Sequence, residues 1–466
     1  MAEQSINRRD AMGQLGGLAS AAVFRAGGSG ASAEVIRINP RIRLQRFTGW
    51  GTSLAWWAHV VGGFPAHIRR RYMENIFHPV RGLGLNVARY NIGGGENPKY
   101  SFLRYRAAIP GFAPTAGKWD WTADRNQVLV LREAMRLGVN QVQAFSNSPP
   151  YYMTRSGSVT GGRGGGPNLR EDDEQAFVNY LVEVTAYFRR RMGIRFQTLE
   201  AFNEPVSAWW KFGGWQEGCH IGNAQQQEII VRLARALRYR GLATRIAAPD
   251  DNSIDETVRT WQSYKALSRE LVHQIDTHSY SGNQRSALRH AAAQGGKVLW
   301  MSEYGDGDAG GMTMARRIVE DMRELRPAAW VYWQAVDGVG GWGFLANELN
   351  GKATDFVVND KYHVMAGFSR FFRPGCRFIA SSSADSLAAV DIASRAVVVA
   401  ILNDRPRERR VQVDLSALGD GVWRVESYIT SSGTKPSQNS RMVRVRGVLP
   451  VDMPGKTLHV MRIVRN

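Results

Sequence analysis

The chain has 466 residues, of which 44% are hydrophobic and 10% aromatic, a composition that excludes a disordered protein and suits one large domain plus a smaller one. Its formal net charge is +19, but Lys and Arg are scattered, which disfavours a nucleic-acid-binding protein and leaves a generally basic surface or an acidic polysaccharide partner. With only two cysteines, Cys219 and Cys376, we expect no disulfide-built fold, no bridge between these two, and no zinc site.

The first 33 residues have the pattern of an export signal. The pair Arg8-Arg9 precedes a weakly apolar run from Ala11 to Phe24, and Ala31-Ser32-Ala33 has the small residues of a cleavage site. The pattern predicts a twin-arginine signal and a secreted or periplasmic mature protein; a disordered tail with a chance arginine pair is the alternative. No other stretch has about 18 uninterrupted apolar residues, so we expect no membrane-spanning helix.

Residues 47–372 alternate short apolar runs with helical patterns, which predicts an α/β fold. Eight such units in about 320 residues match a (β/α)8 (TIM) barrel with long loops. An open doubly wound sheet is the alternative, but Gly93-Gly94-Gly95 lacks the G-x-G-x-x-G helix start that this fold needs. The expected strands span 47–53, 85–91, 141–146, 197–203, 244–248, 274–280, 297–303 and 329–334. The clearest helical patterns span 65–77, 122–137, 171–191, 222–240, 310–324 and 358–372.

The pattern changes after Arg373-Pro374-Gly375, a helix stop signal. Short alternating strands separated by turn residues predict an antiparallel β-sandwich over residues 373–466. Residues 34–46 alternate in the same way, so we expect this side domain to be built from both chain ends. Its expected strands span 386–392, 396–403, 410–415, 421–429, 442–448 and 456–462.

Polar and aromatic residues stand at the C-terminal ends of six predicted barrel strands, where a barrel gathers its active site. Two of them are carboxylates on well-separated strands, Glu204 and Glu303. A glycosidase needs such a pair, because one carboxyl group protonates the leaving oxygen while the other attacks the sugar carbon. The other strand ends hold Arg89-Tyr90-Asn91, Asn147, His278-Ser279-Tyr280 and Tyr332-Trp333-Gln334.

These strand ends resemble a clan of retaining glycosidases that carry an Asn-Glu acid/base on the fourth strand and a Glu nucleophile on the seventh. Within this clan the chain is similar to glycoside hydrolase family 30, a barrel with a side β-sandwich built from both chain ends. Trp56-Trp57 and the stretch Gln216 to Cys219 are most similar to the endo-β-1,6-galactanase branch of that family. The matching stretches are 49–57, 144–151, 202–205, 216–219, 302–304 and 368–375.

The resemblance implies a role for each residue in a double displacement. Glu204 would act first as general acid and then as general base, and Glu303 would be the nucleophile. Arg89 and Tyr280 would donate hydrogen bonds that keep Glu303 ionised, and Asn203 would bind the sugar 2-OH. Trp333 would form the platform under the reacting sugar, in a subsite completed by Trp57, His278 and Asn147.

Structural alternatives exist for several of these residues. Arg89 could be a strand cap, His278 a core histidine, and Trp57 packing at the bottom of the barrel. Glu217 could contact substrate or brace a loop. The same choice between outer subsites and loop packing holds for Trp209, Trp210, Trp215 and Trp342.

Two acidic runs, Asp250-Asp251 and Asp306 with Asp308, lack the ligand spacing of a calcium loop. We expect solvated loop acids there, and neither a metal nor a cofactor in the protein.

The sequence thus predicts an exported, monomeric, retaining endo-glycosidase that acts on β-1,6-linked galactan side chains of the arabinogalactan type. The alternatives are the same mechanism on β-1,6-glucan or xylan, and a non-catalytic polysaccharide-binding protein on the same scaffold. Endo or exo action depends on whether loops 154–168 and 206–221 close one end of the cleft.

Overall fold

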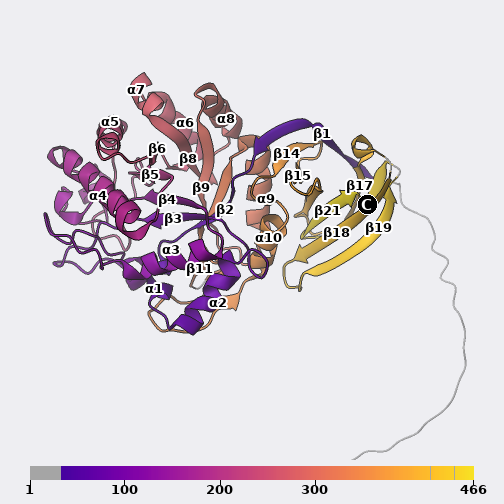
Figure 1. Cartoon of the computed structure of the whole chain (residues 1–466), viewed down its shortest axis with the longest axis horizontal. Helices are drawn as coiled ribbons and strands as arrows, with labels where there is room; N and C mark the ends of the chain where they lie inside the picture. Colours follow the sequence, from indigo (N-terminus) through magenta and orange to yellow (C-terminus); the bar gives the residue numbers. More distant parts are fainter. Residues whose placement is uncertain (1–32, 339, 420, 446, 466) are drawn as a thin grey trace, which may run out of the picture.

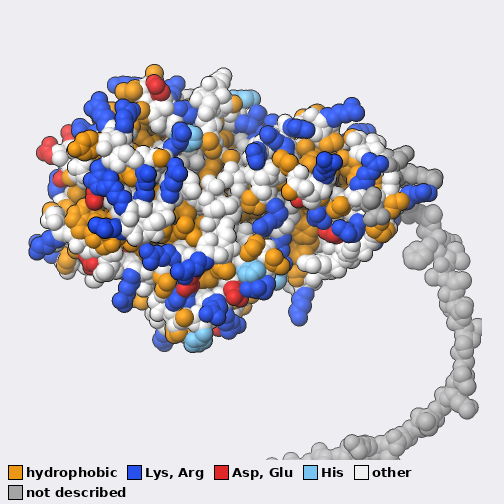
Figure 2. All heavy atoms as spheres, in the orientation of Figure 1, with side chains coloured by type: hydrophobic (Ala, Val, Ile, Leu, Met, Phe, Trp, Pro, Cys, Tyr) orange, Lys and Arg blue, Asp and Glu red, His pale blue; other side chains and the backbone are white. Residues whose placement is uncertain are grey.

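The computed structural model describes residues 33–465 apart from residues 339, 420 and 446, and it comprises a barrel and a curled β-sheet domain (Figure 1). The predicted export signal lies outside the described residues except for its last position. None of the described helices is long and apolar enough to cross a membrane. Lys and Arg side chains are spread over the visible face of both domains, as the scattered charge indicates (Figure 2).

Within the described residues, eight parallel strands close the barrel, which confirms the predicted fold class. Each strand pairs with the next one along the chain, β6 pairs with β8, and the pairing of β10 with β2 closes the ring. A short strand, β7 (Asp251–Ser253), adds to the end of β8. The barrel strands are β2 (Gly49–Ser53), β3 (Val87–Asn91), β4 (Gln141–Phe145), β5 (Thr198–Glu200), β6 (Arg245–Ala247), β8 (Val272–Ser281), β9 (Val298–Tyr304) and β10 (Ala329–Gln334).

Helices cover the outside of the barrel (Figure 1). The predicted helices are present, although the one expected over 310–324 changes at Asp321 into a π-helical turn that ends at Leu325. Four helices of six to ten residues are additional to those predicted. The helices are α1 (Trp57–Gly62), α2 (Ala66–Phe77), α3 (Arg125–Leu137), α4 (Glu174–Met192), α5 (Asn223–Tyr239), α6 (Ile254–Ser263), α7 (Ala266–Leu271), α8 (Arg285–Gln294), α9 (Met312–Glu320) and α10 (Asp360–Ser369).

Helix α4 shows how the sequence builds this layer. Phe177, Leu181, Val184 and Phe188 recur at spacings of three or four, so they share one face, and all four are fully buried. Each such side chain stabilises the fold by about 1.5–3 kcal/mol through burial. The helix ends at Gly193, whose φ of 68° gives the left-handed C-terminal cap that glycine adopts without strain.

The second domain is one continuous sheet of described strands that curls over its own core. Its order is β19-β18-β21-β16-β15-β14-β1-β17-β20. Strand β1 runs antiparallel to β14 and parallel to β17, so residues 34–46 join the C-terminal strands and add one parallel pair to the expected antiparallel arrangement. The strands are β1 (Glu34–Arg46), β14 (Arg377–Ser381), β15 (Ser386–Val390), β16 (Val397–Asn403), β17 (Arg409–Asp414), β18 (Gly421–Ser431), β19 (Ser437–Val445), β20 (Val448–Met453) and β21 (Thr457–Arg465).

One face of this sheet packs against the barrel. Leu387, Leu402 and Leu458 belong to the same buried cluster as the barrel core. Tyr428 also joins this cluster, and its hydroxyl donates a hydrogen bond of 2.9 Å to the carbonyl of His363 in α10. The two domains therefore share part of their apolar core. Cys219 and Cys376 are both buried free thiols.

Candidate active site

A cavity of about 380 Å³ opens beyond the C-terminal ends of the barrel strands. Both predicted catalytic carboxylates line it, and so does Asp337 of the short strand β11 (Val336–Asp337), which pairs with β12 (Leu345–Ala346) and, through it, with β13 (Val357–Val358). The cavity is lined by Trp56, Arg106, Asn147, Asn203, Glu204, Trp210, Trp215, Gln216, Glu217, Tyr280, Glu303, Trp333, Asp337 and Trp342.

Glu204 lies in the turn after β5 rather than on the strand itself. Its φ is 49°, a conformation that costs a non-glycine residue free energy and clusters at functional sites. Three hydrogen bonds hold this backbone: its amide donates to the Asp250 carbonyl at 2.9 Å, and its carbonyl accepts from Trp210 Nε1 at 2.9 Å and from the Ser207 amide at 3.1 Å. Its carboxyl oxygens accept from Asn252 Nδ2 at 2.6 Å and Trp209 Nε1 at 3.2 Å.

Glu303 lies near the C-terminal end of β9, and its carboxyl group accepts hydrogen bonds from two donors. Arg89 Nη1 donates to its Oε2 at 2.8 Å, and the Tyr280 hydroxyl donates to its Oε1 at 3.1 Å. These are the two donors that the sequence indicated. Burial raises the pKa of Glu303, while the positive charges of His278 and Arg89 act in the opposite direction.

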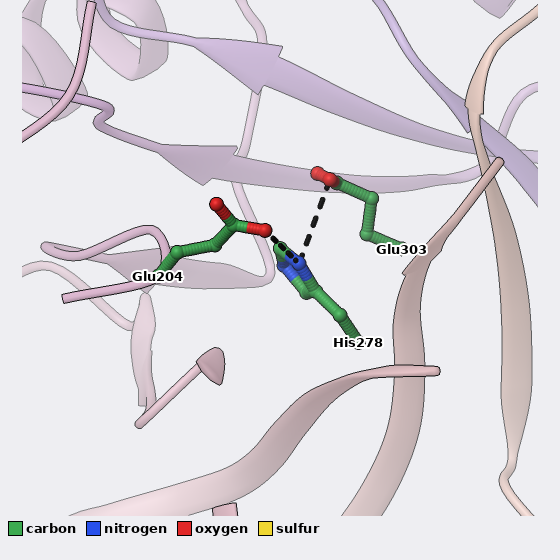
Figure 3. Close-up of side chains that lie close together, drawn as sticks. All are labelled: Glu204, His278 and Glu303. Carbon is green, nitrogen blue, oxygen red and sulfur yellow. Dashed lines mark hydrogen bonds and ion pairs between the residues drawn. The ribbon is translucent and has the colours of Figure 1, made fainter. Parts of the chain in front are cut away.

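His278 joins the two glutamates (Figure 3). Its Nδ1 lies 3.1 Å from Glu204 Oε1 and 3.5 Å from Glu303 Oε1, and the ring is fully buried. Burial alone would lower the pKa of His278, but the adjacent carboxylates, Glu303 and Asp250 foremost, raise it well above its ordinary value. The surrounding charge therefore favours a protonated ring, which lies between the two carboxyl groups.

The spacing of these groups bears on the stereochemistry of the reaction. One oxygen of Glu204, one oxygen of Glu303 and a ring nitrogen of His278 all lie within 4.8 Å of one another. Retaining glycosidases hold their carboxyl groups about 5–5.5 Å apart, whereas inverting enzymes need about 6.5–9.5 Å to admit a water. The arrangement suits direct attack by a carboxylate on the sugar.

Two clusters have donor sets that could in principle bind a metal ion. In the first, Glu204, His278 and Glu303, a metal would need a neutral imidazole, whereas the surrounding charge favours the protonated ring. In the second, Glu200, Asp250 and Asp276, the guanidinium of Arg89 already supplies the cation, because Nη2 donates to Glu200 at 3.1 Å and to Asp250 at 2.8 Å. In each cluster a protonated side chain, His278 in the first and Arg89 in the second, supplies the positive charge that a metal ion would otherwise supply.

The acidic run Asp250-Asp251 is a correction to the sequence analysis, which expected solvated loop acids. Both side chains are 0% exposed. Asp250 follows the predicted strand 244–248 after one intervening residue, Pro249. The expectation that site residues lie at the C-terminal ends of barrel strands, which found Glu204 and Glu303, would therefore also have found Asp250. Asn252, two residues on, donates to Glu204 and was missed for the same reason.

Trp57 is a second correction. Its ring is 0% exposed, its Nε1 donates to the Ser53 carbonyl at 2.8 Å, and it stacks near Phe77 in the core. Helix α1 begins at Trp57, which turns this side chain inward and leaves Trp56 on the cavity side. Trp56 lines the cavity and packs edge-on against Trp333, with ring centroids 5.2 Å apart.

The remaining predicted residues, Asn147, Asn203, Tyr280 and Trp333, all line the cavity. Asn203 Oδ1 is buried and has no hydrogen-bond partner within the described part of the chain. A buried acceptor without a partner costs free energy, so this oxygen is available to a ligand hydroxyl group.

Glu217 braces a loop and also lines the cavity. Its Oε1 accepts from the amides of Gly94 at 2.9 Å and Gly95 at 3.2 Å, which braces that loop, while the residue also lines the cavity. Burial raises the pKa of Glu217 to about 8. Of the tryptophans considered for outer subsites, Trp210, Trp215 and Trp342 line the cavity.

Asp306 and Asp308, the second acidic run, brace loops. Asp306 binds the buried Lys361 Nζ at 2.8 Å, and Asp308 accepts from the amides of Gly310 and Thr313, each at 2.9 Å.

Known proteins similar to this chain carry related activities in their names. An endo-beta-1,6-galactanase from Hypocrea rufa is 33% identical over 395 residues, which cover 79% of this chain and 81% of that protein. An exo-beta-1,6-galactobiohydrolase from Bifidobacterium longum is 24% identical over 84% of this chain, but the chain spans only 36% of that protein's length.

Solved structures share the fold at lower sequence identity. A conserved exported protein from Bacteroides fragilis superposes with a TM-score of 0.78 at 20% identity and covers 92% of this chain and 100% of that one. The catalytic domain of xylanase C from Talaromyces cellulolyticus follows with a TM-score of 0.74 at 22% identity, over 92% of this chain and 100% of that one. An endo-beta1,6-glucanase has a TM-score of 0.68 at 18% identity, over 93% of this chain and 94% of that one.

The sequence profile of O-Glycosyl hydrolase family 30 matches residues 33–293, a span that includes Glu204 and all barrel strands up to β8. Together with the galactanase relative that matches most of the chain, and with a barrel that joins two carboxyl groups through one imidazole, this match shows that the protein is an O-glycosyl hydrolase and belongs to glycoside hydrolase family 30.

Proposed function

We propose that this hydrolase is a retaining endo-β-1,6-galactanase that cleaves galactan side chains of the arabinogalactan type. The substrate is supported by the Hypocrea rufa relative that carries this activity in its name. The retaining mechanism is supported by one observation above all: Glu204 and Glu303 approach the same imidazole nitrogen, at 3.1 and 3.5 Å.

In the first step Glu303 attacks the anomeric carbon and forms a glycosyl ester. The bond from that carbon to the glycosidic oxygen breaks, and the leaving oxygen takes the carboxyl proton of Glu204. In the second step a water gives a proton back to Glu204 and attacks the same carbon, which frees Glu303. The sugar leaves with its original anomeric configuration.

Several side chains would bind the sugar during this reaction. Asn203 accepts a hydroxyl proton through its unpaired Oδ1, and hydrogen bonds to the 2-OH strengthen in the transition state. Trp333 and Trp56 present aromatic surface to the reacting sugar. Trp215 and Trp342, about 37% exposed, extend this aromatic wall outward and support binding of more than one sugar unit, as endo action needs.

The test is hydrolysis of a panel of β-glycans by the purified protein, with product lengths and anomeric configuration read by NMR. We expect galacto-oligosaccharides of mixed length, with retained configuration, from β-1,6-galactan. Turnover of β-1,6-glucan or xylan instead would reject the substrate but keep the mechanism, and release of a single short product would reject endo action. Acidic arabinogalactan belongs in the panel because the chain carries a charge of +19.

The two catalytic roles are tested by Glu204→Gln and Glu303→Gln. We expect each to lower kcat by at least about 1,000-fold. With a substrate whose leaving group needs no proton, Glu204→Gln should still form the glycosyl ester, and added azide should then restore turnover. A wild type as inactive as both variants would instead indicate a polysaccharide-binding protein.

We also propose that the protein is exported through a twin-arginine signal and acts as a secreted or periplasmic monomer. The proposal rests on Arg8-Arg9, the weakly apolar run behind them and the small residues at 31–33. Cleavage after Ala33 would leave Glu34, the first residue of β1, at the N-terminus. N-terminal sequencing of the exported protein and retention of a double Arg-to-Lys variant in the cytoplasm would test it, and light scattering would give the mass.

A further inference from the structure

Asp250 contacts three residues of the predicted site, Arg89, His278 and Glu204, although it does not line the cavity. It is 0% exposed and lies between β6 and β7. Its Oδ2 accepts from Arg89 Nη2 at 2.8 Å, and its Oδ1 accepts from Ser302 Oγ at 2.5 Å. The same Oδ1 lies 3.2 Å from His278 Nε2, and the Asp250 carbonyl accepts the Glu204 amide at 2.9 Å.

The electrostatic surroundings make this carboxyl group an anion. Burial alone would raise the pKa of Asp250, but Arg89 and His278 outweigh it and hold the pKa below its ordinary value. By contrast, burial raises the pKa of Asp276 to about 6, and burial with the neighbouring carboxylates raises the pKa of Glu200 well above its ordinary value. Within this buried cluster, Asp250 therefore carries the negative charge that faces the imidazole.

The charged and titratable groups around His278 come from several strands. Glu204 follows β5, Tyr280 lies on β8 and Glu303 on β9, and their contacts surround the Nδ1 side of the ring. Arg89 on β3 joins Asp250 to Glu303, while Asp251 on β7 and Asp276 on β8 interact electrostatically with Asp250. Only the carboxylate of Asp250 meets the Nε2 side at ion-pair distance among these described groups.

We propose that Asp250 is a positioning residue that holds His278 as an imidazolium between the two catalytic glutamates, and that it orients Glu303 through Arg89. The role rests on the proposed double displacement. The Asp250 carboxylate faces Nε2 at an ion-pair distance of 3.2 Å, without an aligned hydrogen bond, while Nδ1 faces Glu204 and Glu303. Sugar and water do not meet Asp250, which acts only through other residues.

A shared imidazolium suits both steps of a double displacement. The first step requires Glu303 as the attacking anion and Glu204 as the proton donor. After the glycosyl ester forms, Glu303 is neutral and Glu204 is the anion. Because Nδ1 is 3.1 Å from one carboxyl group and 3.5 Å from the other, the same cation stabilises whichever group is charged without moving.

The variant Asp250→Asn removes the charge and keeps the shape. Asp250 has a φ of 66°, and asparagine tolerates this left-handed conformation best among non-glycine residues, so the backbone under Glu204 should persist. The matched control is Asp251→Asn, one position along and equally buried, whose carboxyl group contacts neither Arg89 nor His278. Burial raises the pKa of Asp251 to about 7, so amide replacement changes little charge in slightly acidic buffer.

The first readout is the protonation state of His278, which needs no substrate. The chain has nine histidines, so 15N-histidine labelling gives a tractable spectrum, with His278 assigned from its own alanine variant. In the wild type we expect an imidazolium from pH 5 to 8. In Asp250→Asn the ring should become neutral within this range, and in Asp251→Asn it should stay charged. A neutral wild-type ring at pH 7 overturns the proposal even where a variant does not fold.

The second readout is kinetic, on whichever glycan the wild type hydrolyses. Asp250→Asn should lower kcat by about 100-fold with KM within about twofold, and its pH profile should shift with the titration of His278. Asp251→Asn should stay within about twofold of wild type. Equal effects of the two variants, or an Asp250→Asn ring that stays charged, would overturn the role. An enzyme inactive on every glycan would reject the proposed function, while the spectrum still tests Asp250.

Discussion

Trp56 and Trp57 are adjacent and chemically identical, yet they serve different parts of the protein. Trp57→Ala removes a fully buried indole, which should cost about 3–5 kcal/mol of unfolding free energy and yield little folded protein. Trp56→Ala removes a wall of the cavity and should instead raise KM by about tenfold or more with a melting temperature near that of wild type. Thermal melts and steady-state kinetics of the two variants check this. A raised KM in Trp57→Ala together with a lowered melting temperature in Trp56→Ala would instead place Trp57 in the sugar-binding subsite.

Among single residues, the sequence placed correctly those that stand at the C-terminal end of a predicted barrel strand. Glu204, Glu303 and Arg89 follow that rule, and the structure brings them together. Trp57 did not follow it, because the first helix starts between two tryptophans and a one-residue difference decides which indole points inward. Asp250 was misread because an Asp-Asp pair looks like a solvated loop, although its position just after a predicted strand was a local signal for the site.

In the loop after β5, residues 201–222, Gly218 packs closely against Trp210, and Trp210 holds the backbone of Glu204. A Cβ at Gly218 would lie 2.0 Å from the Trp210 ring, and Trp210 in turn donates to the Glu204 carbonyl. We expect Gly218→Ala to displace Trp210 and Glu204 together and to lower kcat by about 100-fold, since displacements near 1 Å have effects of this size. Steady-state kinetics measure the loss of kcat, and a thermal melt shows whether the Gly218→Ala variant is folded.

Gly222→Ala is the control for that loop, because no atom lies within 4 Å of the added methyl group and the backbone φ of −67° suits alanine. It should leave kcat within about twofold of wild type. If both glycine variants are fully active, Trp210 does not position Glu204.

Elements with a long, clear hydrophobic period were predicted within a few residues, whereas short ones were not. Helices α6, α7 and α8 have six to ten residues, too few for a helical period to stand out from the loops. Strand β20 contains Pro450, which reads as a strand breaker; it is tolerated because β20 is the edge of the sheet. The parallel pairing of β1 with β17 depends on chain ends about 375 residues apart, which no local pattern encodes.

The whole molecule should unfold as one unit, because the sheet domain completes the apolar core behind α10. Trp423 lies in the sheet's own core and Tyr428, on the same strand, faces the barrel. Trp423→Ala and Tyr428→Ala should therefore both lower the temperature at which barrel activity is lost, each with a single calorimetric transition. A Trp423→Ala protein that melts in two steps, with activity surviving the first, would show independent domains.

The pH dependence of stability follows from the buried carboxyl groups. Burial raises the pKa of Asp251 and Asp124 to about 7 and of Glu217 to about 8. A raised carboxyl pKa favours the folded state fully below the unfolded value, near 4, and this contribution is lost as pH rises through the folded pKa. His459 acts on the acid side: burial lowers its pKa to about 4, so its contribution is present above about 6.5 and lost as pH falls towards 4.

Because three carboxyl groups outweigh one histidine, these terms predict a melting temperature that declines from about pH 4.5 towards pH 8. Asp251→Asn should abolish one part of the decline, because the amide stays neutral at every pH. The variant should match the wild type at pH 4 and exceed it at pH 8 by as much as about 4 kcal/mol, the equivalent of three pKa units. Denaturant unfolding at both pH values measures the difference. Since Asp251 contacts neither Arg89 nor His278, this gain should come without loss of activity; a variant no more stable than wild type at pH 8 would mean that Asp251 is ionised and solvated in the folded protein.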